Sequence, residues 1–281
     1  MYGRRASMDV GQQDCLVDVG AGGQLHVEIC GSGAPVLLVP GLGGRGSFWA
    51  SQIADFAACY RVMALDHRNC GRSVGGKPTV ALTDLVEDII AMMDALGIER
   101  LHFVGHSTGG AIGQHLALAY PDRLASLVLS CTWPGPDPYF TRLFAARRRI
   151  LLESGADSYF AFGTYLSMPA SNLQAILARE PDYVEKRAAA FPGIETELSR
   201  IDALMAHNLR DRLHEVRVPT LCIGAKDDQI TPSAFTQELG DLIPGAETHL
   251  LDGGGHFCPI VEAPAYNARL LQFLNAQGEP Q

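Results

Sequence analysis

Ser107 lies in the pentapeptide Gly-His-Ser-Thr-Gly, between an apolar run that ends at Val104 and a run of small and apolar residues. This setting predicts a sharp turn from a strand into a helix, because glycines two residues before and after the serine let the backbone fold back without a Cβ clash. At such a turn the hydroxyl is exposed at the end of the sheet, close to the positive end of the helix. The pattern predicts a nucleophile that attacks a carbonyl carbon; a glycine-rich turn that merely contains serine is the alternative.

A serine hydroxyl needs a base to take its proton and a carboxylate to orient that base. Two carboxylates, Asp227 and Asp228, follow an apolar run and precede Pro232. We expect Asp228, four residues before the proline, to be the catalytic acid, and Asp227 to cap the loop or face water. Aspartates in turns commonly accept backbone N–H bonds, so a structural role is the alternative for either one.

His256 is the expected base. It follows the last strand-like run and the three glycines 253–255, which let its loop approach the serine closely. It also completes the chain order serine, acid, histidine that accompanies a serine on a strand-to-helix turn. His106 adjoins Ser107, but its side chain should project away from the hydroxyl, so we expect it to pack beside the site or line it.

The oxyanion formed by such an attack needs two fixed N–H donors. One is expected from Thr108, directly after the nucleophile, and the other from Leu42 in the segment Pro-Gly-Leu-Gly-Gly at residues 40–44. Gly41 in this segment is expected to contact the substrate, because glycines leave the backbone bare. A plain glycine-rich turn is the alternative.

Strand-like and helical patterns alternate around these residues. Strand-like runs span residues 25–30, 36–40, 61–66, 101–105, 124–130, 220–224 and 247–251, and helical patterns span residues 47–58, 82–96, 108–120, 233–242 and 263–275. The alternation predicts the α/β class, with a mostly parallel central sheet flanked by helices.

The strand signal disappears between residues 133 and 212, where a proline-rich turn is followed by short helical pieces. We expect an α/β core formed by residues 14–132 and 213–281, with residues 133–212 as a helical lid over the carboxyl ends of the strands, where open α/β sheets bind ligands. Residues 1–13 are polar and are expected to be poorly ordered.

Substrate contacts are expected from the lid and from the histidine loop. The lid carries arginines at 142 and 147–149. Arginine binds carboxylates through two parallel hydrogen bonds, so we expect Arg142 to reach the substrate, although at helical spacing most of the four would face water. Trp133 and Phe257 are expected at the same pocket; for aromatic residues of the lid, the alternative is packing of the lid onto the core.

Composition restricts the partners of this chain. It has 281 residues, of which 47% are hydrophobic, and a net charge of −9, which argues against a nucleic-acid partner. Its seven cysteines form no Cys-x-x-Cys pair, which indicates free thiols in a reducing compartment and no metal site. Neither a membrane span nor a signal peptide is apparent. We therefore expect a cytoplasmic monomer or homodimer that acts on a small molecule without a cofactor.

These motifs together resemble those of the α/β-hydrolase superfamily. The resemblance covers about residues 16–274 and rests on segments 40–43, 66–73 and 105–109, on Asp228 with Pro232, and on Gly255 with His256. It implies the α/β-hydrolase fold, with a helical lid inserted after the sixth strand and a Ser-Asp-His triad. The chain departs from the common pattern at Pro40, where many members have histidine, and at Asn69, where glycine is usual.

Within the superfamily, segments 41–49 and 141–154 are most similar to the aminoacrylate hydrolases of pyrimidine breakdown and to the 3-oxoadipate enol-lactonases, which act on small acids. The expected function is a cofactor-independent serine hydrolase of a small carboxylic ester or lactone, including carboxylate-bearing ones, with an enamine or amide as further options. The alternatives are carbon–carbon bond hydrolysis of ring-fission diketones, a cofactor-free perhydrolase, and a ligand sensor on the same fold.

Overall fold

The structure is a computed structural model that describes residues 13–20, 22–77 and 81–278. The expectation of a poorly ordered segment at residues 1–13 therefore lies outside the described residues, except for Gln13, with which the first strand begins.

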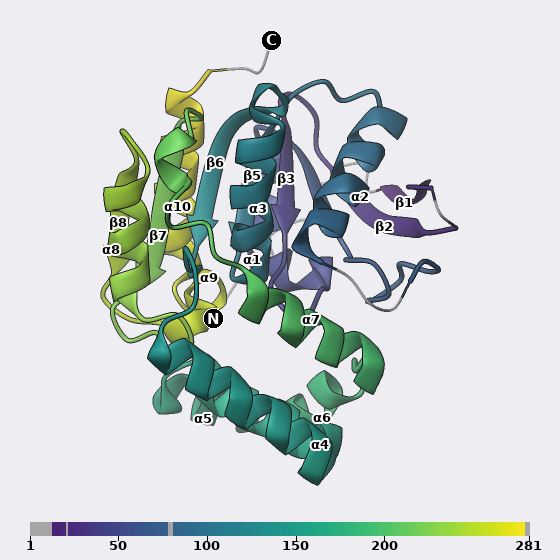
Figure 1. The fold of residues 1–281 in the computed structure, drawn as a ribbon, viewed down its shortest axis with the longest axis vertical. Coiled ribbons are helices and arrows are strands. Elements are labelled where there is room, and N and C mark those ends of the chain that lie inside the picture. Colours follow the sequence, from purple (N-terminus) through teal and green to yellow (C-terminus); the bar gives the residue numbers. More distant parts are fainter. Residues whose placement is uncertain (1–12, 21, 78–80, 279–281) are drawn as a thin grey trace.

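An eight-stranded sheet forms the centre of the molecule (Figure 1). In spatial order its strands are β1 (Gln13–Asp18), β2 (Gln24–Cys30), β4 (Arg61–Leu65), β3 (Pro35–Val39), β5 (Leu101–His106), β6 (Leu124–Ser130), β7 (Thr220–Ala225) and β8 (Glu247–Leu251). The pairs β1–β2 and β2–β4 are antiparallel, and all other neighbouring strands are parallel. The carboxyl ends of the six strands β3 to β8 consequently meet at one edge of the sheet.

The edge strand β1 has no counterpart among the predicted strands. Its sequence is Gln-Asp-Cys-Leu-Val-Asp, and its side chains alternate between solvent and core, so that Leu16 is 54% exposed whereas Val17 is buried. A short polar edge strand of this kind lacks the apolar run by which the other strands are recognised.

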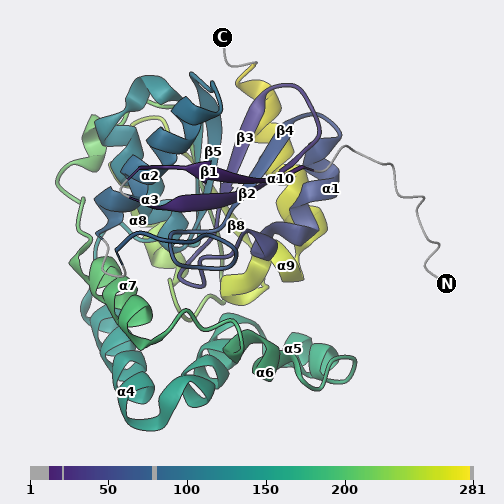
Figure 2. The same cartoon turned by 90° about the vertical axis from the view of Figure 1, so that its right-hand side faces the viewer.

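Both faces of the sheet are buried, and neighbouring residues of one strand contribute to opposite cores. Leu37 and Phe103 belong to the core under α2 (Leu82–Ala95), α3 (Thr108–Ala119) and α8 (Ser233–Leu242). Leu38 and Val104 belong to the core under α1 (Ala50–Ala57) and α10 (Ala263–Ala276). Figure 2 shows the two helical layers on either side of the sheet. The predicted α/β class with a mostly parallel sheet between helices is confirmed.

The stretch between β6 and β7 is helical. It contains α4 (Pro138–Ser167), α5 (Ala170–Leu177), α6 (Tyr183–Ala188) and α7 (Ile194–Ala206). These four helices lie beyond the end of the sheet at which the arrows of β3 and β7 point (Figures 1 and 2). The long helix α4 bends at Gly155, whose φ of 81° is outside the helical region. We refer to residues 133–212 as the helical insertion.

The other helical segments are short and lie in loops of the core. They are the 3₁₀ turns Gly46–Trp49, Pro121–Arg123, Leu213–Glu215 and Gly255–Phe257, and α9 (Cys258–Val261). The single helix predicted at residues 47–58 is thus divided into a 3₁₀ turn and α1. Within the described ranges, every helix is too short or too polar to cross a bilayer.

Candidate active site

Ser107 occupies a strained turn between β5 and α3. Its φ is 54° and its ψ is −117°, in a region that residues with a side chain rarely adopt. The flanking glycines make the turn possible: a Cβ on Gly105 would lie 2.3 Å from the carbonyl oxygen of Gly109, and a Cβ on Gly109 would lie 2.3 Å from that of Val39. The close crossing of β3, β5 and α3 therefore requires the two glycines.

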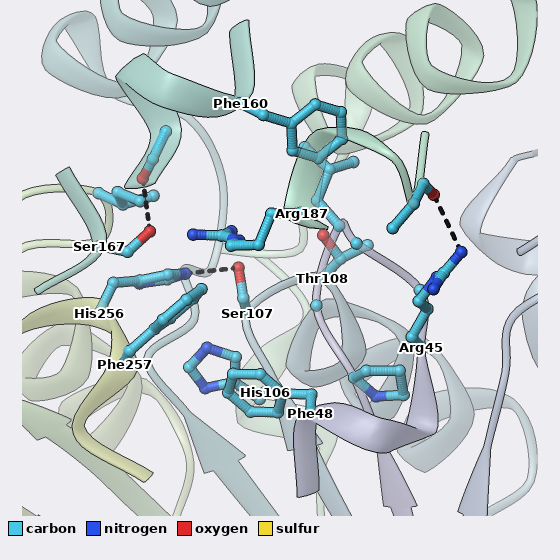
Figure 3. A pocket seen from close by; sticks show the side chains of 18 of the residues that line it. Arg45, Phe48, His106, Ser107, Thr108, Phe160, Ser167, Arg187, His256 and Phe257 are labelled. Carbon is cyan, nitrogen blue, oxygen red and sulfur yellow. Dashed lines mark hydrogen bonds between the residues drawn. The ribbon is translucent and has the colours of Figure 1, made fainter. Parts of the chain in front are cut away.

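The serine hydroxyl is one end of a chain of hydrogen bonds. Ser107 Oγ lies 3.0 Å from Nε2 of His256, and Nδ1 of the same ring lies 2.8 Å from Oδ2 of Asp228. All three side chains are buried. Ser107 is 7% exposed and lines a cavity (Figure 3). In this arrangement His256 can take the serine proton while Asp228 stabilises the charged ring.

Asp228 is held rigidly in the turn after β7. Its Oδ1 accepts hydrogen bonds from the backbone N–H groups of Ile230 (2.8 Å) and Thr231 (2.9 Å), which leaves Oδ2 to face His256. The hydroxyl of Thr231 lies 2.8 Å from that same oxygen. Asp227, by contrast, is exposed, and its Oδ1 accepts a hydrogen bond from the N–H of Gly255 at 2.8 Å. The structure thus brings Asp228, not Asp227, to the histidine.

His106 lies beneath the site. Its ring stacks on Phe48 with centroids 4.6 Å apart, and its Nδ1 lies 3.2 Å from the hydroxyl of Ser130. Burial lowers the pKa of His106 well below its ordinary value, with a further contribution from the nearby His256, whose ring centroid is 4.8 Å away. A neutral ring in this place supports His256 by packing and also lines the cavity.

The glycine-rich segment after β3 passes directly beside the nucleophile. A Cβ added to Gly41 would lie 3.0 Å from Cβ of Ser107, and the N–H of Gly44 donates to the carbonyl of Gly41 at 2.9 Å, which closes a turn around Leu42. Leu42 and Thr108 both line the cavity. Thr108 is the first residue of α3, so its N–H has no partner within the helix and is directed out of its end.

Arg200 of α7 connects the helical insertion to this segment. Its Nη2 lies 3.4 Å from the carbonyl oxygen of Gly41 and donates to Nδ1 of His67 at 2.8 Å, while Nη1 contacts the thiol of Cys70. Burial, followed by the charge of Arg200, lowers the pKa of His67 well below its ordinary value. The neutral ring can therefore accept this hydrogen bond.

A cavity of about 440 Å³ opens above Ser107, between the carboxyl ends of the strands and the helical insertion. This volume is sufficient for a small metabolite. Its walls are mainly apolar and include Phe48, Phe144, Tyr159, Phe160, Phe257 and Ile260. Of the residues predicted to contact the substrate, Gly41, His106 and Phe257 line this cavity.

Two residues predicted to contact the substrate, Arg142 and Trp133, do not line the cavity. Arg142 is exposed on the outer side of α4. Trp133 is 1% exposed and packs against Phe140, with ring centroids 4.6 Å apart. Its backbone carbonyl accepts hydrogen bonds from Gln114 and His207, and the indole belongs to the core that joins the insertion to the sheet.

Arg147 and Arg187 do line the cavity. Arg147 is one of the four lid arginines considered from the sequence, whereas Arg187 was not singled out. A signal existed for Arg147: Phe140, Phe144 and Leu151 are buried at spacings of three and four residues around it, so Arg147 shares the inner face of α4. Arg187 lies on the short helix α6, and its position depends on how the insertion folds back over the core.

Cys131, Asp228 and His256 place one donor atom each within 4.8 Å of one another, a spacing that a metal ion could bridge. The protonation states of Cys131 and His256 do not suit metal binding. A hydrogen bond with Cys258 and burial raise the pKa of the Cys131 thiol well above its ordinary value, whereas metals bind the thiolate. Nδ1 of His256 is already bonded to Asp228. The thiol of Cys131 therefore keeps its proton, and Nδ1 of His256 shares its proton with Asp228 rather than binding a metal.

Known proteins resemble this chain in sequence and in fold. Residues 34–263 match the family model described as the alpha/beta hydrolase fold. The chain is 37% identical over 254 residues to a protein of Azorhizobium caulinodans named "Putative carbamate hydrolase RutD", covering 90% of this chain and 96% of that protein. A protein of the same name from Variovorax paradoxus is 37% identical over 260 residues, covering 91% and 98% of the two chains. The enol-lactonase of Burkholderia xenovorans LB400 superposes with a TM-score of 0.82 at 27% identity, covering 94% of this chain and 100% of that structure. The chain belongs to the α/β-hydrolase family.

Proposed function

We propose that this hydrolase cleaves a small carboxylic ester or lactone through an acyl-enzyme at Ser107. The observation that carries the proposal is the continuous chain of hydrogen bonds from Ser107 through His256 to Asp228, which ends in a cavity of metabolite size. A buried base with a fixed carboxylate is what a serine hydroxyl needs to become a nucleophile near neutral pH.

In the first half of the reaction, Ser107 Oγ attacks the carbonyl carbon while its proton passes to Nε2 of His256. Asp228 holds the ring in the tautomer with a proton on Nδ1 and stabilises the imidazolium that forms. The N–H groups of Leu42 and Thr108 stabilise the negative charge on the carbonyl oxygen. His256 then protonates the leaving oxygen, and the acyl group remains on Ser107.

In the second half, His256 takes a proton from water, and the resulting hydroxide attacks the acyl carbon. The proton returns to Ser107 Oγ as the acid leaves. The side chains of Phe48, Phe160 and Phe257 surround this step and limit the access of bulk water.

A carbamate is the second candidate substrate class. It is favoured by the relatives named as carbamate hydrolases, which match this chain at up to 37% identity over nearly their full length. The ester and lactone proposal draws its support from the enol-lactonase, which superposes over its full length. Both substrate classes present a carbonyl carbon to the same nucleophile.

The test compares the wild type with Ser107→Ala on p-nitrophenyl esters of graded chain length, on simple lactones and on p-nitrophenyl carbamates. We expect turnover of esters or lactones with a chain-length optimum, and a loss of about 10⁴-fold or more in kcat for Ser107→Ala, as for other serine triads. Circular dichroism and thermal melts of the variant verify that the fold is intact.

Three outcomes would contradict the proposal. Activity retained in Ser107→Ala would remove the serine from the mechanism. Turnover of carbamates without esters or lactones would establish the second candidate. A folded wild type without turnover of any of the three classes would favour carbon–carbon bond hydrolysis, perhydrolysis or ligand sensing.

A further inference from the structure

The cavity above Ser107 is lined by more basic than acidic side chains. Arg147 of α4 and Arg187 of α6 both line the cavity, together with Arg45 of the core. Figure 3 shows the side chain of Arg187 extending over Ser107, on the same side as His256 and Phe257.

The cavity has fewer acidic than basic side chains, so the arginine charges are not all balanced. Among the charged residues that line it, three are arginines and one is a glutamate, Glu197. Glu197 accepts a hydrogen bond from the hydroxyl of Tyr159 at 2.6 Å, and that hydroxyl in turn accepts one from Nη2 of Arg147 at 3.1 Å. Glu197 therefore offsets the charge of Arg147 through Tyr159, and the charges of Arg187 and Arg45 are left without an acidic partner at the cavity.

Arg187 is held in place by neutral groups. Its Nη1 donates to the hydroxyl of Thr164 at 2.8 Å, and its guanidinium lies 4.8 Å from the ring centroid of Phe257. No carboxylate within the described ranges lies within ion-pair distance of Arg187 or Arg147. These contacts fix the plane of the guanidinium and leave further N–H groups available for a ligand.

A guanidinium withdrawn from water without a counter-ion is unfavourable, and a bound anion would relieve this cost. Burial lowers the pKa of Arg187, and the charge of Arg147 adds to this effect. The planar fork of N–H donors matches the two oxygens of a carboxylate. Because the remaining wall is largely apolar, a small organic acid fits this cavity better than a highly charged ligand does.

We propose that Arg187 binds a carboxylate group of the substrate, so that the preferred substrate is a small acid whose ester or lactone bond lies at Ser107. The inference rests on the proposed function for the bond that is cleaved, but the anion site can be measured without any turnover. Arg187 acts here as a specificity-determining residue, because it contacts a part of the substrate that does not react.

The experiment measures inhibition of p-nitrophenyl acetate hydrolysis by glutarate and by glutaramide, which differ in charge but hardly in shape. We expect the wild type to bind glutarate at least about tenfold more tightly than glutaramide, as charged hydrogen bonds are among the strong ones. In Arg187→Gln this preference should fall about tenfold or more. Arg187→Lys, which keeps the charge but loses the fork, should retain part of it.

Arg142→Gln is the matched control, because Arg142 is an exposed arginine of the same insertion that does not line the cavity. It should keep the full preference for glutarate. Equal affinity of the wild type for the two ligands would overturn the inference, and so would a preference that persists in Arg187→Gln, since another donor group would then hold the carboxylate.

Failure of the proposed function gives a different result. If p-nitrophenyl acetate is not hydrolysed, or is hydrolysed equally by Ser107→Ala, the serine mechanism fails. Isothermal titration calorimetry of the same two ligands with the wild type, Arg187→Gln and Arg142→Gln still decides whether Arg187 forms the anion site.

Discussion

Asp227 and Asp228 are adjacent in the sequence, yet their carboxylates stabilise different parts of the same loop. Oδ2 of Asp228 is bonded to Nδ1 of His256, whereas Oδ1 of Asp227 accepts the N–H of Gly255, the residue just before that histidine. One aspartate therefore orients the imidazole ring and the other fixes the backbone that carries it.

Asp228→Asn should lower kcat by about 10³- to 10⁴-fold, because an amide can present its N–H₂ group to His256 and stabilise the wrong tautomer. Asp227→Asn should change kcat less than about tenfold, since the amide oxygen can still accept the N–H of Gly255. Steady-state kinetics on the best ester of the panel measure both variants. A larger loss in Asp227→Asn than in Asp228→Asn would reassign the acid.

Gly109→Ala should destabilise the fold, because its Cβ would lie 2.3 Å from the carbonyl oxygen of Val39, a backbone atom that cannot move aside freely. We expect a loss of about 1–3 kcal/mol in the free energy of unfolding. Gly43→Ala is the control: an added Cβ there meets nothing within 4 Å, so a change within about 0.5 kcal/mol is expected. Urea unfolding followed by circular dichroism measures both variants, and equal stability of the two would contradict the crowding at the turn.

His207 makes the stability depend on pH. Burial, with a smaller effect of His115, lowers the pKa of His207 to about 3 in the folded state. The unfolded chain binds this proton near pH 6.5, so the contribution of the neutral ring to stability is complete above pH 6.5 and is lost as the pH falls toward 3. His207 alone should lower the free energy of unfolding by about 2 kcal/mol between pH 7 and pH 5.

His207→Gln should reduce that pH dependence, because glutamine does not titrate. The exposed His214 provides the control variant His214→Gln, which should leave the pH dependence as in the wild type. Urea titrations at pH 7 and pH 5 measure the difference. An unchanged slope in His207→Gln would mean that other groups, such as the neighbouring His115, account for the acid sensitivity.

Local sequence patterns were sufficient to predict the strands of the sheet and the turn at Ser107, because both depend on residues close together in the chain. Seven of the eight strands have an apolar run, and the β5–α3 turn is recognisable because only glycine fits at positions 105 and 109. The exception, β1, is an edge strand whose polar side chains face solvent. The roles predicted for Ser107, Asp228 and His256 remain predictions, although the structure brings the three side chains into hydrogen-bond distance.

The wall of the cavity could not be predicted in the same way. Arg142 and Arg147 are chemically identical and lie on the same helix. They differ only in the side of α4 on which they lie, and Arg147 is on the buried side. Arg187 depends on contacts between distant segments, since Thr164 and Phe257 hold it from two different parts of the chain. Such a position follows from the packing of the insertion on the core, which residue spacing alone does not encode.

The contacts of Arg200 have a consequence for how the active site is reached. Moving α7 away from the core would leave Nδ1 of the buried His67 without its partner, at a cost typical of an unpaired buried polar group. Arg187 of α6 contacts the core through the ring of Phe257, and its hydrogen bond to Thr164 stays within the insertion. The core also holds the chain just after α6, because Nη2 of Arg45 donates to the carbonyl of Ala190. Separating the insertion from the core would therefore break hydrogen bonds at both α7 and the end of α6.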